Sequence, residues 1–235
     1  DKLGLNNLEQ VNGLIADIAA KQHKMGSIPQ KIGDVYNLSM DTTRRNQEGI
    51  APVLPVLQEI ENVTDKAQWS EVLGKAMDFG LWAMYVDADA MNSSMNILHS
   101  YQAGIGMSDR DYYLKEDARS KSLRAKYQQF VAKMFVLAGY PEKTAKTAAK
   151  EIMQIETALA KAQFNRVELR DPYKNYHKMS LNDLQQLAPE FDWQTYFKAL
   201  GMPVNELNVS QDVFMKEMAK VFSNSSMAAI KYYLA

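Results

Sequence analysis

The sequence predicts a mainly α-helical protein that carries one short β-hairpin near residues 81–104. Two observations lead to this class. Apolar residues recur every three or four positions along most of the chain. One stretch instead contains two apolar runs typical of extended strands, separated by a polar turn. With 235 residues and 46% hydrophobic content, the chain is long enough to bury a substantial core. By length, the chain forms one large domain or two small ones.

The first third of the chain is predicted to form helices separated by polar or glycine-containing breaks. A helix near Pro55 is expected because proline fits the first helical turn. Thr64 is expected to cap a further helix that closes at Gly80. The apolar faces are formed by Leu8, Val11, Ile15 and Ile18, then by Ile28, Ile32, Val35 and Ser39, and after Thr64 by Trp69, Val72, Leu73, Ala76 and Met77.

The extended runs are LWAMYVDADA (81–90) and MNILHSYQAG (95–104). Both are rich in aromatic and apolar residues, which favour strands. Asn92, Ser93 and Ser94 between them are residue types that suit a turn. These residues therefore predict the β-hairpin.

The second half gives the clearest helical pattern, a pair of long helices. A break of four residues separates them, so we expect an antiparallel helical hairpin. Shorter helices are expected after a capping box at Ser180 and Asp183, and from Gln211 to Phe222. The long pair is marked by Leu123, Tyr127, Phe130, Val131, Met134 and Phe135, and then by Pro141, Ala145, Ala148, Ile152, Ile155, Leu159 and Ala162.

Composition removes several function classes. The 27 basic and 28 acidic residues nearly balance, so neither nucleic acid nor anionic lipid is favoured as a partner. The absence of cysteine excludes disulfides, thiolate nucleophiles and cysteine-based metal sites. The chain opens on Asp1 rather than methionine, and we expect it to be a piece of a longer polypeptide.

Residues with the spacing of a self-sufficient active site are not found. His23, His99 and His177 are isolated in sequence, whereas a helical zinc site needs two histidines one turn apart. Asp87 and Asp89 lack the other ligands of a calcium loop. A cryptic hydrolase that uses these aspartates with a histidine is the weakest of three hypotheses. We expect no metal and no cofactor in this chain.

Two unusual blocks combine arginine, aspartate and tyrosine. The first is AGIGMSDRDYYL (103–114), and the second lies in LRDPYKNYHKMSLNDL (169–184). Proline forces the residue before it out of helical geometry, while arginine can bind carboxylates or free carbonyls and tyrosine buries its ring. Structural clasps for non-helical connections are favoured over ligand contacts. The clasp residues are Arg110, Asp111, Tyr112 and Tyr113, and Arg170, Asp171, Pro172, Tyr173 and Tyr176.

These two blocks also carry a resemblance. GIGMSDRDYYL resembles the Gly-Leu-Gly-Leu-Pro-x-Arg-Asp-Tyr-Tyr block of the neprilysin and endothelin-converting-enzyme family of zinc endopeptidases. RDPYKNYHKMSL resembles that family's Arg-x-Pro-x-x-x-Tyr-x-Lys-Met-Ser/Thr-Leu block at the correct distance downstream. The segments DADAMNSSMNILHSYQ, EGIAPVLPVLQEIE and AAIKYYLA are similar to family segments in the same order. Met107 and Ser108 replace the usual Leu-Pro. The resemblance covers essentially the whole chain.

The resemblance implies that residues 1–235 form a single multi-helix lobe, the non-catalytic N-terminal lobe of an extracytoplasmic zinc metalloendopeptidase. In such enzymes a His-Glu-x-x-His helix and a downstream glutamate bind the zinc in a C-terminal lobe, and no such motif is present here. The implied role is to roof the cavity that admits short peptides. The implied partners are the catalytic lobe of the same polypeptide and peptide substrates.

One substrate contact is implied by the resemblance. Asp1 matches the aspartate of the family's Arg-(four residues)-Asp-x-x-Arg constellation, although Gly4 stands in place of the second arginine. A rival hypothesis from another class is a free-standing helical module that binds a peptide or protein without catalysis. A reading frame that continues into a His-Glu-x-x-His helix discriminates between the two hypotheses.

Overall fold

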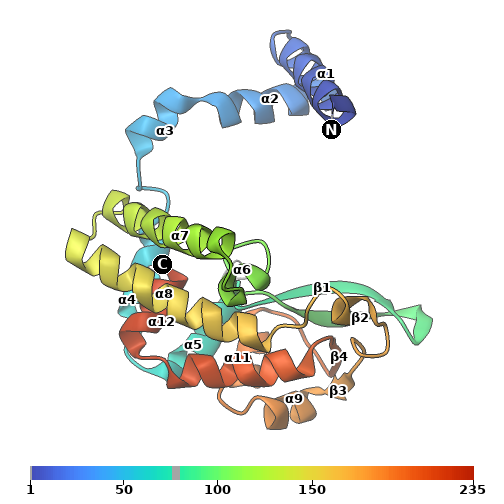
Figure 1. Ribbon diagram of the computed structural model, residues 1–235. Helices are drawn as coiled ribbons and strands as arrows, with labels where there is room; N and C mark the ends of the chain where they lie inside the picture. Colours follow the sequence, from blue (N-terminus) through green and yellow to red (C-terminus); the bar gives the residue numbers. More distant parts are fainter. Residues whose placement is uncertain (1, 76–79) are drawn as a thin grey trace. The chain divides into compact units, whose positions relative to one another are not determined.

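Figure 1 shows a computed structural model of the chain, which describes residues 2–75 and 80–235. The predicted positions Asp1, Ala76 and Met77 lie outside the described residues. The chain divides into two compact units, Asp1–Val53 and Leu54–Ala235, which we call unit 1 and unit 2. The mainly helical class with a small sheet is confirmed.

Unit 1 contains α1 (Lys2–Ala19), α2 (Ile28–Met40) and α3 (Thr42–Glu48). The two predicted apolar faces do lie on helices, but they are only partly covered. Among the described residues of this unit, Gly33 is the only buried one, and its Cα faces the Ala19 backbone closely enough that a Cβ would lie 3.5 Å from Ala19 Cα. Side chains of Ser27 and Asp41 cap α2 and α3. Local capping and one close helix contact therefore define this unit.

Unit 2 has a mixed four-stranded sheet in the order β1-β2-β4-β3. The predicted hairpin is confirmed as β1 (Trp82–Asp89) and β2 (Asn92–Gln102), which pair antiparallel. β4 (Glu206–Val209) pairs parallel to β2, and β3 (Lys178–Ser180) pairs antiparallel to β4. These two strands were not predicted, because three or four residues are too few to show a period of two.

The hairpin turn differs from the prediction. It lies at Ala90 and Met91, and Asn92 already pairs with Asp89 inside the ladder. The reason is local: Asp89 Oδ1 accepts a hydrogen bond from the Met91 amide at 2.9 Å, so this aspartate forms the turn that Asn92–Ser94 were expected to form. The predicted cap at Thr64 is likewise displaced by one residue, to Asp65.

The helical hairpin is confirmed, and its second helix is central to unit 2. Figure 1 shows α8 lying between α7 and α11, and it also contacts α12. Of its residues, Ala145, Ala148, Leu159 and Ala160 are fully buried. The helices of unit 2 are α4 (Leu54–Asn62), α5 (Trp69–Lys75), α6 (Asp111–Leu114), α7 (Ala118–Leu137), α8 (Glu142–Ala162), α9 (Leu181–Leu187), α10 (Trp193–Ala199), α11 (Asp212–Asn224) and α12 (Met227–Leu234), with 3-10 turns at Lys66–Gln68 and Glu168–Arg170.

An aromatic cluster fixes the sheet onto the helices. The Trp82 ring lies 5.5 Å from Phe191, 5.1 Å from Trp193 and 5.3 Å from Tyr196, centroid to centroid. Such tilted and edge-on pairs suit the charge distribution of aromatic rings. Through the Trp82 ring, the core of unit 2 thus holds the first residue of the hairpin.

Over residues 2–75 and 80–235, none of the helices combines the length and the apolar character that crossing a bilayer requires.

Candidate functional site

The first block forms the connection from β2 to α6 and depends on two glycines. Gly104 adopts a φ of +81°, and its carbonyl accepts a hydrogen bond from the Tyr233 hydroxyl at 2.8 Å. A Cβ on Gly106 would collide with the Tyr127 hydroxyl. Glycine is therefore required at both positions, once for conformation and once for close approach.

A buried carboxylate from α8 receives this turn. Glu156 is 4% exposed, and its Oε1 accepts hydrogen bonds from the Gly106 amide at 3.0 Å and the Tyr127 hydroxyl at 2.9 Å. Its Oε2 accepts one from the Tyr113 hydroxyl at 2.8 Å. The same Tyr113 oxygen accepts the Met107 amide at 2.8 Å. We call Gly106, Tyr113, Tyr127 and Glu156 the Glu156 cluster.

Burial decides the protonation behaviour of the Glu156 cluster. Desolvation raises the pKa of Glu156 above its usual range, although its three hydrogen bonds oppose that change. Burial, followed by the nearby Glu156 charge, raises the pKa of the Tyr113 and Tyr127 hydroxyls far above the usual phenol value. Both phenols therefore remain protonated donors, which suits a structural hydrogen-bond network and not a general base.

The remaining residues of the first block contact the backbone. The Arg110 guanidinium does not pair with Asp111; its Nη1 donates to the Gln163 carbonyl at 2.5 Å. Asp111 forms an exposed ion pair with Lys115 at 2.8 Å. The Tyr112 carbonyl accepts from Arg124 at 2.9 Å. The arginine thus binds a carbonyl at the C-terminal end of α8, one of the two kinds of partner that its chemistry predicted.

The second block is held through different residues than its sequence suggested. Arg170 is exposed and makes no side-chain hydrogen bond or ion pair with any described residue. Pro172 is exposed, and the Tyr173 side chain is 78% exposed. Asp171 Oδ1 accepts from the amides of Tyr173 at 3.0 Å and Lys174 at 3.2 Å. The aspartate therefore forms the turn, while its neighbours face solvent.

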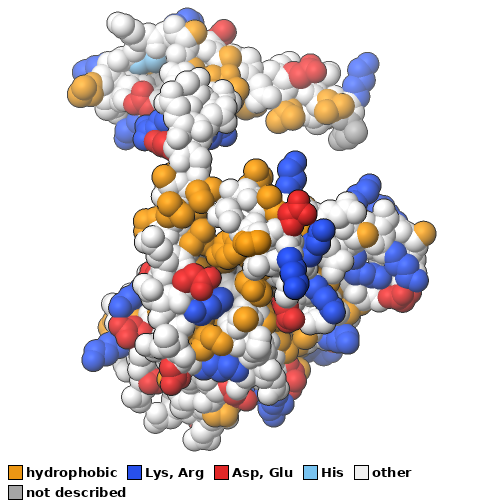
Figure 2. Space-filling model, turned by 90° about the vertical axis from the view of Figure 1, so that its left-hand side faces the viewer, with side chains coloured by type: hydrophobic (Ala, Val, Ile, Leu, Met, Phe, Trp, Pro, Cys, Tyr) orange, Lys and Arg blue, Asp and Glu red, His pale blue; other side chains and the backbone are white. Residues whose placement is uncertain are grey.

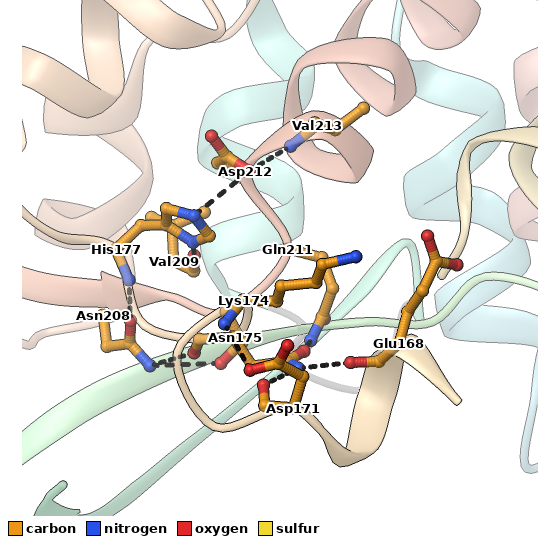
Figure 3. A network of polar contacts seen from close by, with 11 residues as sticks. Glu168, Asp171, Lys174, Asn175, His177, Asn208, Val209, Gln211, Asp212 and Val213 are labelled. Atoms are coloured by element: carbon orange, nitrogen blue, oxygen red, sulfur yellow. Dashed lines mark hydrogen bonds and ion pairs between the residues drawn. The ribbon is translucent and has the colours of Figure 1, made fainter. Parts of the chain in front are cut away.

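Asn175 is the centre of the network that fixes this turn (Figure 3). Its Nδ2 donates to the carbonyls of Glu168 at 2.8 Å and Asp171 at 2.7 Å, and its Oδ1 accepts from Gln211 Nε2 at 2.5 Å. Asn208 joins the same network by donating to the Asn175 carbonyl at 3.1 Å. The side-chain amides of Asn175 and Asn208 thus donate hydrogen bonds to backbone carbonyls of a loop that lies outside regular secondary structure.

The two blocks are joined through the end of β2. Gln102 exchanges two hydrogen bonds with Phe164, at 3.0 and 2.7 Å, next to the carbonyl that Arg110 binds. The Gln102 amide donates to Gln211 Oε1 at 2.8 Å, and Gln211 continues to Asn175. A continuous hydrogen-bonded path thus connects the first block, the α8 C-terminus and the second block.

Tyr176 of the second block donates a hydrogen bond to another buried carboxylate, that of Asp89. Asp89 is 2% exposed; its Oδ1 accepts from the Tyr176 hydroxyl at 2.8 Å, and its Oδ2 lies 3.3 Å from Lys178 Nζ. Lys178 also pairs with Glu206 at 2.8 Å. The Met91 amide, then Tyr176 and then Lys178 hold the pKa of Asp89 below its usual range. We call Asp89, Tyr176, Lys178 and Glu206 the Asp89 cluster.

His99, His177 and Asp87 contact mainly backbone groups and asparagine or aspartate side chains. His99 lies against the Ala88 carbonyl at 3.3 Å and Asn208 at 3.1 Å. His177 contacts the Val209 carbonyl and lies 3.7 Å from Asp212 (Figure 3). Asp87 accepts from the neighbouring Ala88 amide. Across residues 2–75 and 80–235, no group of three or more histidine, aspartate or glutamate side chains could hold a metal ion.

Several residues of the site were missed by the sequence reasoning: Gln102, Glu156, Gln163, Asn175, Asn208 and Gln211. Glu156 did have a signal, because it lies between Ile155 and Leu159 next to the apolar face of a strongly periodic helix. A single charge at such a position indicates a buried, hydrogen-bonded group. The amides had no comparable signal, since asparagine and glutamine are common at exposed positions.

Comparison with known proteins identifies relatives over the whole chain. The model of peptidase family M13, for its N-terminal part, matches residues 1–235. Endothelin-converting enzyme 1 of Bos taurus is 26% identical over 214 residues, which is 85% of this chain and 28% of that protein. An endothelin-converting enzyme homolog of Locusta migratoria is 31% identical over 145 residues, 61% of this chain and 19% of that protein.

Solved structures give the same result for the fold. The open state of the zinc metalloprotease Zmp1 of Mycobacterium tuberculosis has a TM-score of 0.84 and 28% identity, covering 99% of this chain and 37% of that one. PepO from Lactobacillus rhamnosis has a TM-score of 0.78 at 19% identity, covering 99% and 38%, and so supports the fold alone. The chain thus spans little more than a third of these structures and under a third of the curated relatives.

Proposed function

Because the chain belongs to peptidase family M13, we propose that it is the non-catalytic N-terminal lobe of a zinc metalloendopeptidase. The match of the family's N-terminal model to all 235 residues is the observation that carries this proposal. Zmp1 is a zinc metalloprotease, and this chain covers 37% of its length. The lobe works together with a catalytic lobe of the same polypeptide.

The zinc of the parent enzyme is held outside this chain. This assignment is supported by the described side chains, which form no cluster with three metal ligands. Zinc in such a site polarises the scissile carbonyl and activates water. The residues described here contribute by positioning and enclosing the substrate. The parent enzyme acts outside the cytoplasm, in the periplasm, at the cell surface or after secretion, on short peptides that the lobe admits to a roofed cavity.

The two sequence blocks are structural clasps in this proposal. The Glu156 cluster holds the glycine-rich turn on α8, and Arg110 binds the end of that helix. Asp171 and Tyr176 hold the second block, whereas Arg170, Pro172 and Tyr173 are exposed. Asp1 is the proposed contact to the far end of the peptide substrate.

Exposed apolar side chains on unit 2 support docking of a second lobe. Figure 2 shows hydrophobic side chains gathered beside Lys and Arg side chains on the face of unit 2 that it presents. Met134 and Leu137 near the α7 C-terminus are 48% and 60% exposed, and Leu54 and Val56 of α4 are 38% and 42% exposed. A group of exposed apolar side chains on a protein surface often marks a site of contact with another protein domain.

The test compares the 235-residue chain with the parent polypeptide on internally quenched peptides. The parent is expected to hydrolyse short peptides and to lose activity with a chelator, and the 235-residue chain alone to be inactive. Roofing is tested with the same sequence in a short peptide and in a folded protein, of which only the peptide should be cleaved. Chelator-sensitive hydrolysis by the 235-residue chain, or equal cleavage of both substrates, would contradict the proposal.

The second candidate function is a free-standing helical module that binds a peptide or protein without catalysis. It is favoured by the same lack of a metal-binding group among the described residues. The longer reading frame decides between the two candidates. A His-Glu-x-x-His helix in the same polypeptide supports the peptidase lobe, and its absence supports the binding module.

A further inference from the structure

The exposed side of α7 carries positive charge that neither clasp uses. Figure 1 shows α8 between α7 and α11, so α7 forms an outer layer of unit 2. Its sequence, ARSKSLRAKYQQFVAKMFVL, contains no aspartate or glutamate. Two of its basic residues, Lys121 and Arg124, pair with Glu116 just before the helix, at 3.1 and 3.2 Å. Local ion pairs therefore account for only part of the positive charge of this helix.

The remaining basic residues of α7 are Arg119, Lys126 and Lys133. All are exposed, and their side chains have no hydrogen-bond or ion-pair partner among residues 2–75 and 80–235. Each is seven residues from the next. Seven residues make nearly two helical turns, so the positions drift by only about 20° around the helix at each step. The three cations therefore follow one face of α7, and we call them the basic row.

Apolar side chains lie beside the basic row. Phe130 and Leu137 follow Lys126 and Lys133 by four residues, a spacing that makes two side chains neighbours on a helix surface. Phe130 is 58% exposed, Leu137 is 60% exposed, and Met134, four residues after Phe130, is 48% exposed. This face therefore combines the two parts of a protein contact, apolar side chains and charges beside them.

We propose that this face of α7 binds an acidic amphipathic helix of the same polypeptide, outside residues 1–235. The inference rests on the proposed function, because the rest of the parent polypeptide supplies that helix. The partner carries aspartate or glutamate at seven-residue spacing opposite the basic row. Its apolar side chains cover Phe130, Met134 and Leu137. Two helices packed side by side keep a seven-residue repeat in register, as they do in coiled coils.

A helix fits this face better than an anionic bilayer does. The whole chain has a net charge of -1, so long-range attraction does not draw it to anionic lipid. Basic clusters that bind such lipid hold about four to eight lysines or arginines, whereas the basic row holds three. A fluid bilayer also gives no reason for a seven-residue repeat, while a neighbouring helix does.

The test treats the parent polypeptide with a water-soluble carbodiimide, which joins a lysine amine to a carboxylate where the two are in contact. The reagent activates the carboxylate, the amine displaces it as a urea, and an amide bond remains. Peptide mass spectrometry then locates the links. We expect Lys126 and Lys133 to be linked to two acidic residues that lie seven positions apart in one segment outside residues 1–235.

A variant of the apolar part provides the second measurement. Phe130→Ala keeps both lysines but removes an apolar contact, so the initial rate of both links should fall by about tenfold. Because Phe130 is exposed within this chain, the fold should tolerate the change. The control is Val213→Ala on α11, where Val213 is 52% exposed, and its links should form at the unchanged rate.

The outcomes separate this inference from the proposed function. Links only within residues 1–235, links to a second polypeptide, links of only one lysine, or no links would overturn it. Equal rates for Phe130→Ala and the unchanged parent, or binding to phosphatidylglycerol vesicles that Lys126→Glu abolishes, would do the same. The expected links in a parent without peptidase activity would contradict the proposed function alone, and an active peptidase without them would contradict this inference alone.

Discussion

The Glu156 and Asp89 clusters are built from similar parts and respond oppositely to pH. In each, a carboxylate that is at most 4% exposed accepts a hydrogen bond of 2.8 Å from a tyrosine of one of the two blocks. Asp89 also faces Lys178, whereas the partners of Glu156 are two phenols and a backbone amide. Desolvation raises the pKa of Glu156, whereas the Met91 amide and Tyr176, followed by Lys178, lower the pKa of Asp89. A buried carboxylate therefore takes its charge state from the balance between its burial and the donors that face it.

The largest expected effect separates the tyrosines of the two blocks. Tyr113 is 3% exposed and Tyr173 is 78% exposed. Replacing Tyr113 with alanine removes a buried ring and two hydrogen bonds, which should lower the free energy of unfolding by about 3–5 kcal/mol. The matched variant Tyr173→Ala should change it by less than about 0.5 kcal/mol. Urea denaturation of both variants measures the difference, and similar losses would show that the blocks are equivalent.

A smaller effect is expected at the glycine-rich turn. In Gly106→Ala the new methyl group would meet the Tyr127 hydroxyl and Glu156 Oε1, which should cost about 1–3 kcal/mol as for other overpacked sites. Gly139→Ala is not a suitable control because its φ is +92°. Gly13→Ala in α1 is suitable, since its added Cβ has no neighbour within 4 Å apart from adjacent residues and the backbone of its own helix. Thermal unfolding should show a lower midpoint for Gly106→Ala alone.

The pH dependence of stability should have opposite signs for the two carboxylates. Because the folded-state pKa of Glu156 is raised, the folded chain binds more protons there, and stability falls as pH rises through the window above the ordinary glutamate pKa. The pKa of Asp89 is lowered, so its contribution is present above the ordinary aspartate pKa and lost as pH falls.

Two variants isolate these contributions. The difference in unfolding free energy between the unchanged chain and Glu156→Gln should be larger below the ordinary glutamate pKa than at neutral pH. For Asp89→Asn the difference should be larger at neutral pH and shrink in acid. Urea titrations across this pH range measure both. Slopes of the same sign would contradict the opposite pKa directions of the two carboxylates.

The smallest expected effect concerns the arginines that begin the two blocks. Arg170 is exposed without a side-chain partner among the described residues, so Arg170→Ala should leave stability within about 0.5 kcal/mol of the unchanged chain. Arg110→Ala should be more harmful because the Gln163 carbonyl loses its donor. Differential scanning calorimetry of the pair tests this, and a loss for Arg170→Ala as large as that for Arg110→Ala would contradict the assignment.

The sequence predicted the parts of this fold that have a local apolar pattern. The helical hairpin of α7 and α8 follows from repeated apolar positions, and the strand pair β1 and β2 follows from two runs rich in aromatic and apolar residues; both are present. β3 and β4 could not be predicted, since their pairing joins residues 178–180 to residues near 207 and depends on long-range contacts. Unit 1 is helical as predicted, but its apolar faces are only partly covered, with Leu8 58% exposed.

The candidate site was predicted only in outline. The blocks were recognised from arginine, aspartate and tyrosine, yet their partners, the buried Glu156 and the half-buried Asn175, come from distant or unmarked positions. The similarity of the two Arg-Asp pairs was misleading, because Arg110 reaches a helix end whereas Arg170 faces solvent. Side-chain identity indicated the chemistry that was possible, and only tertiary packing selected the partner.

The clasp role of the first block is tested most directly by Tyr113→Phe in the parent polypeptide, with stability and kcat/KM for a short peptide measured on the same sample. The substitution keeps the ring but leaves the Met107 amide and Glu156 without the hydroxyl. We predict a loss of about 1–3 kcal/mol in unfolding free energy and an unchanged kcat/KM for the folded enzyme. A large fall in kcat/KM with unchanged stability would contradict the account, because it would place Tyr113 in contact with the substrate.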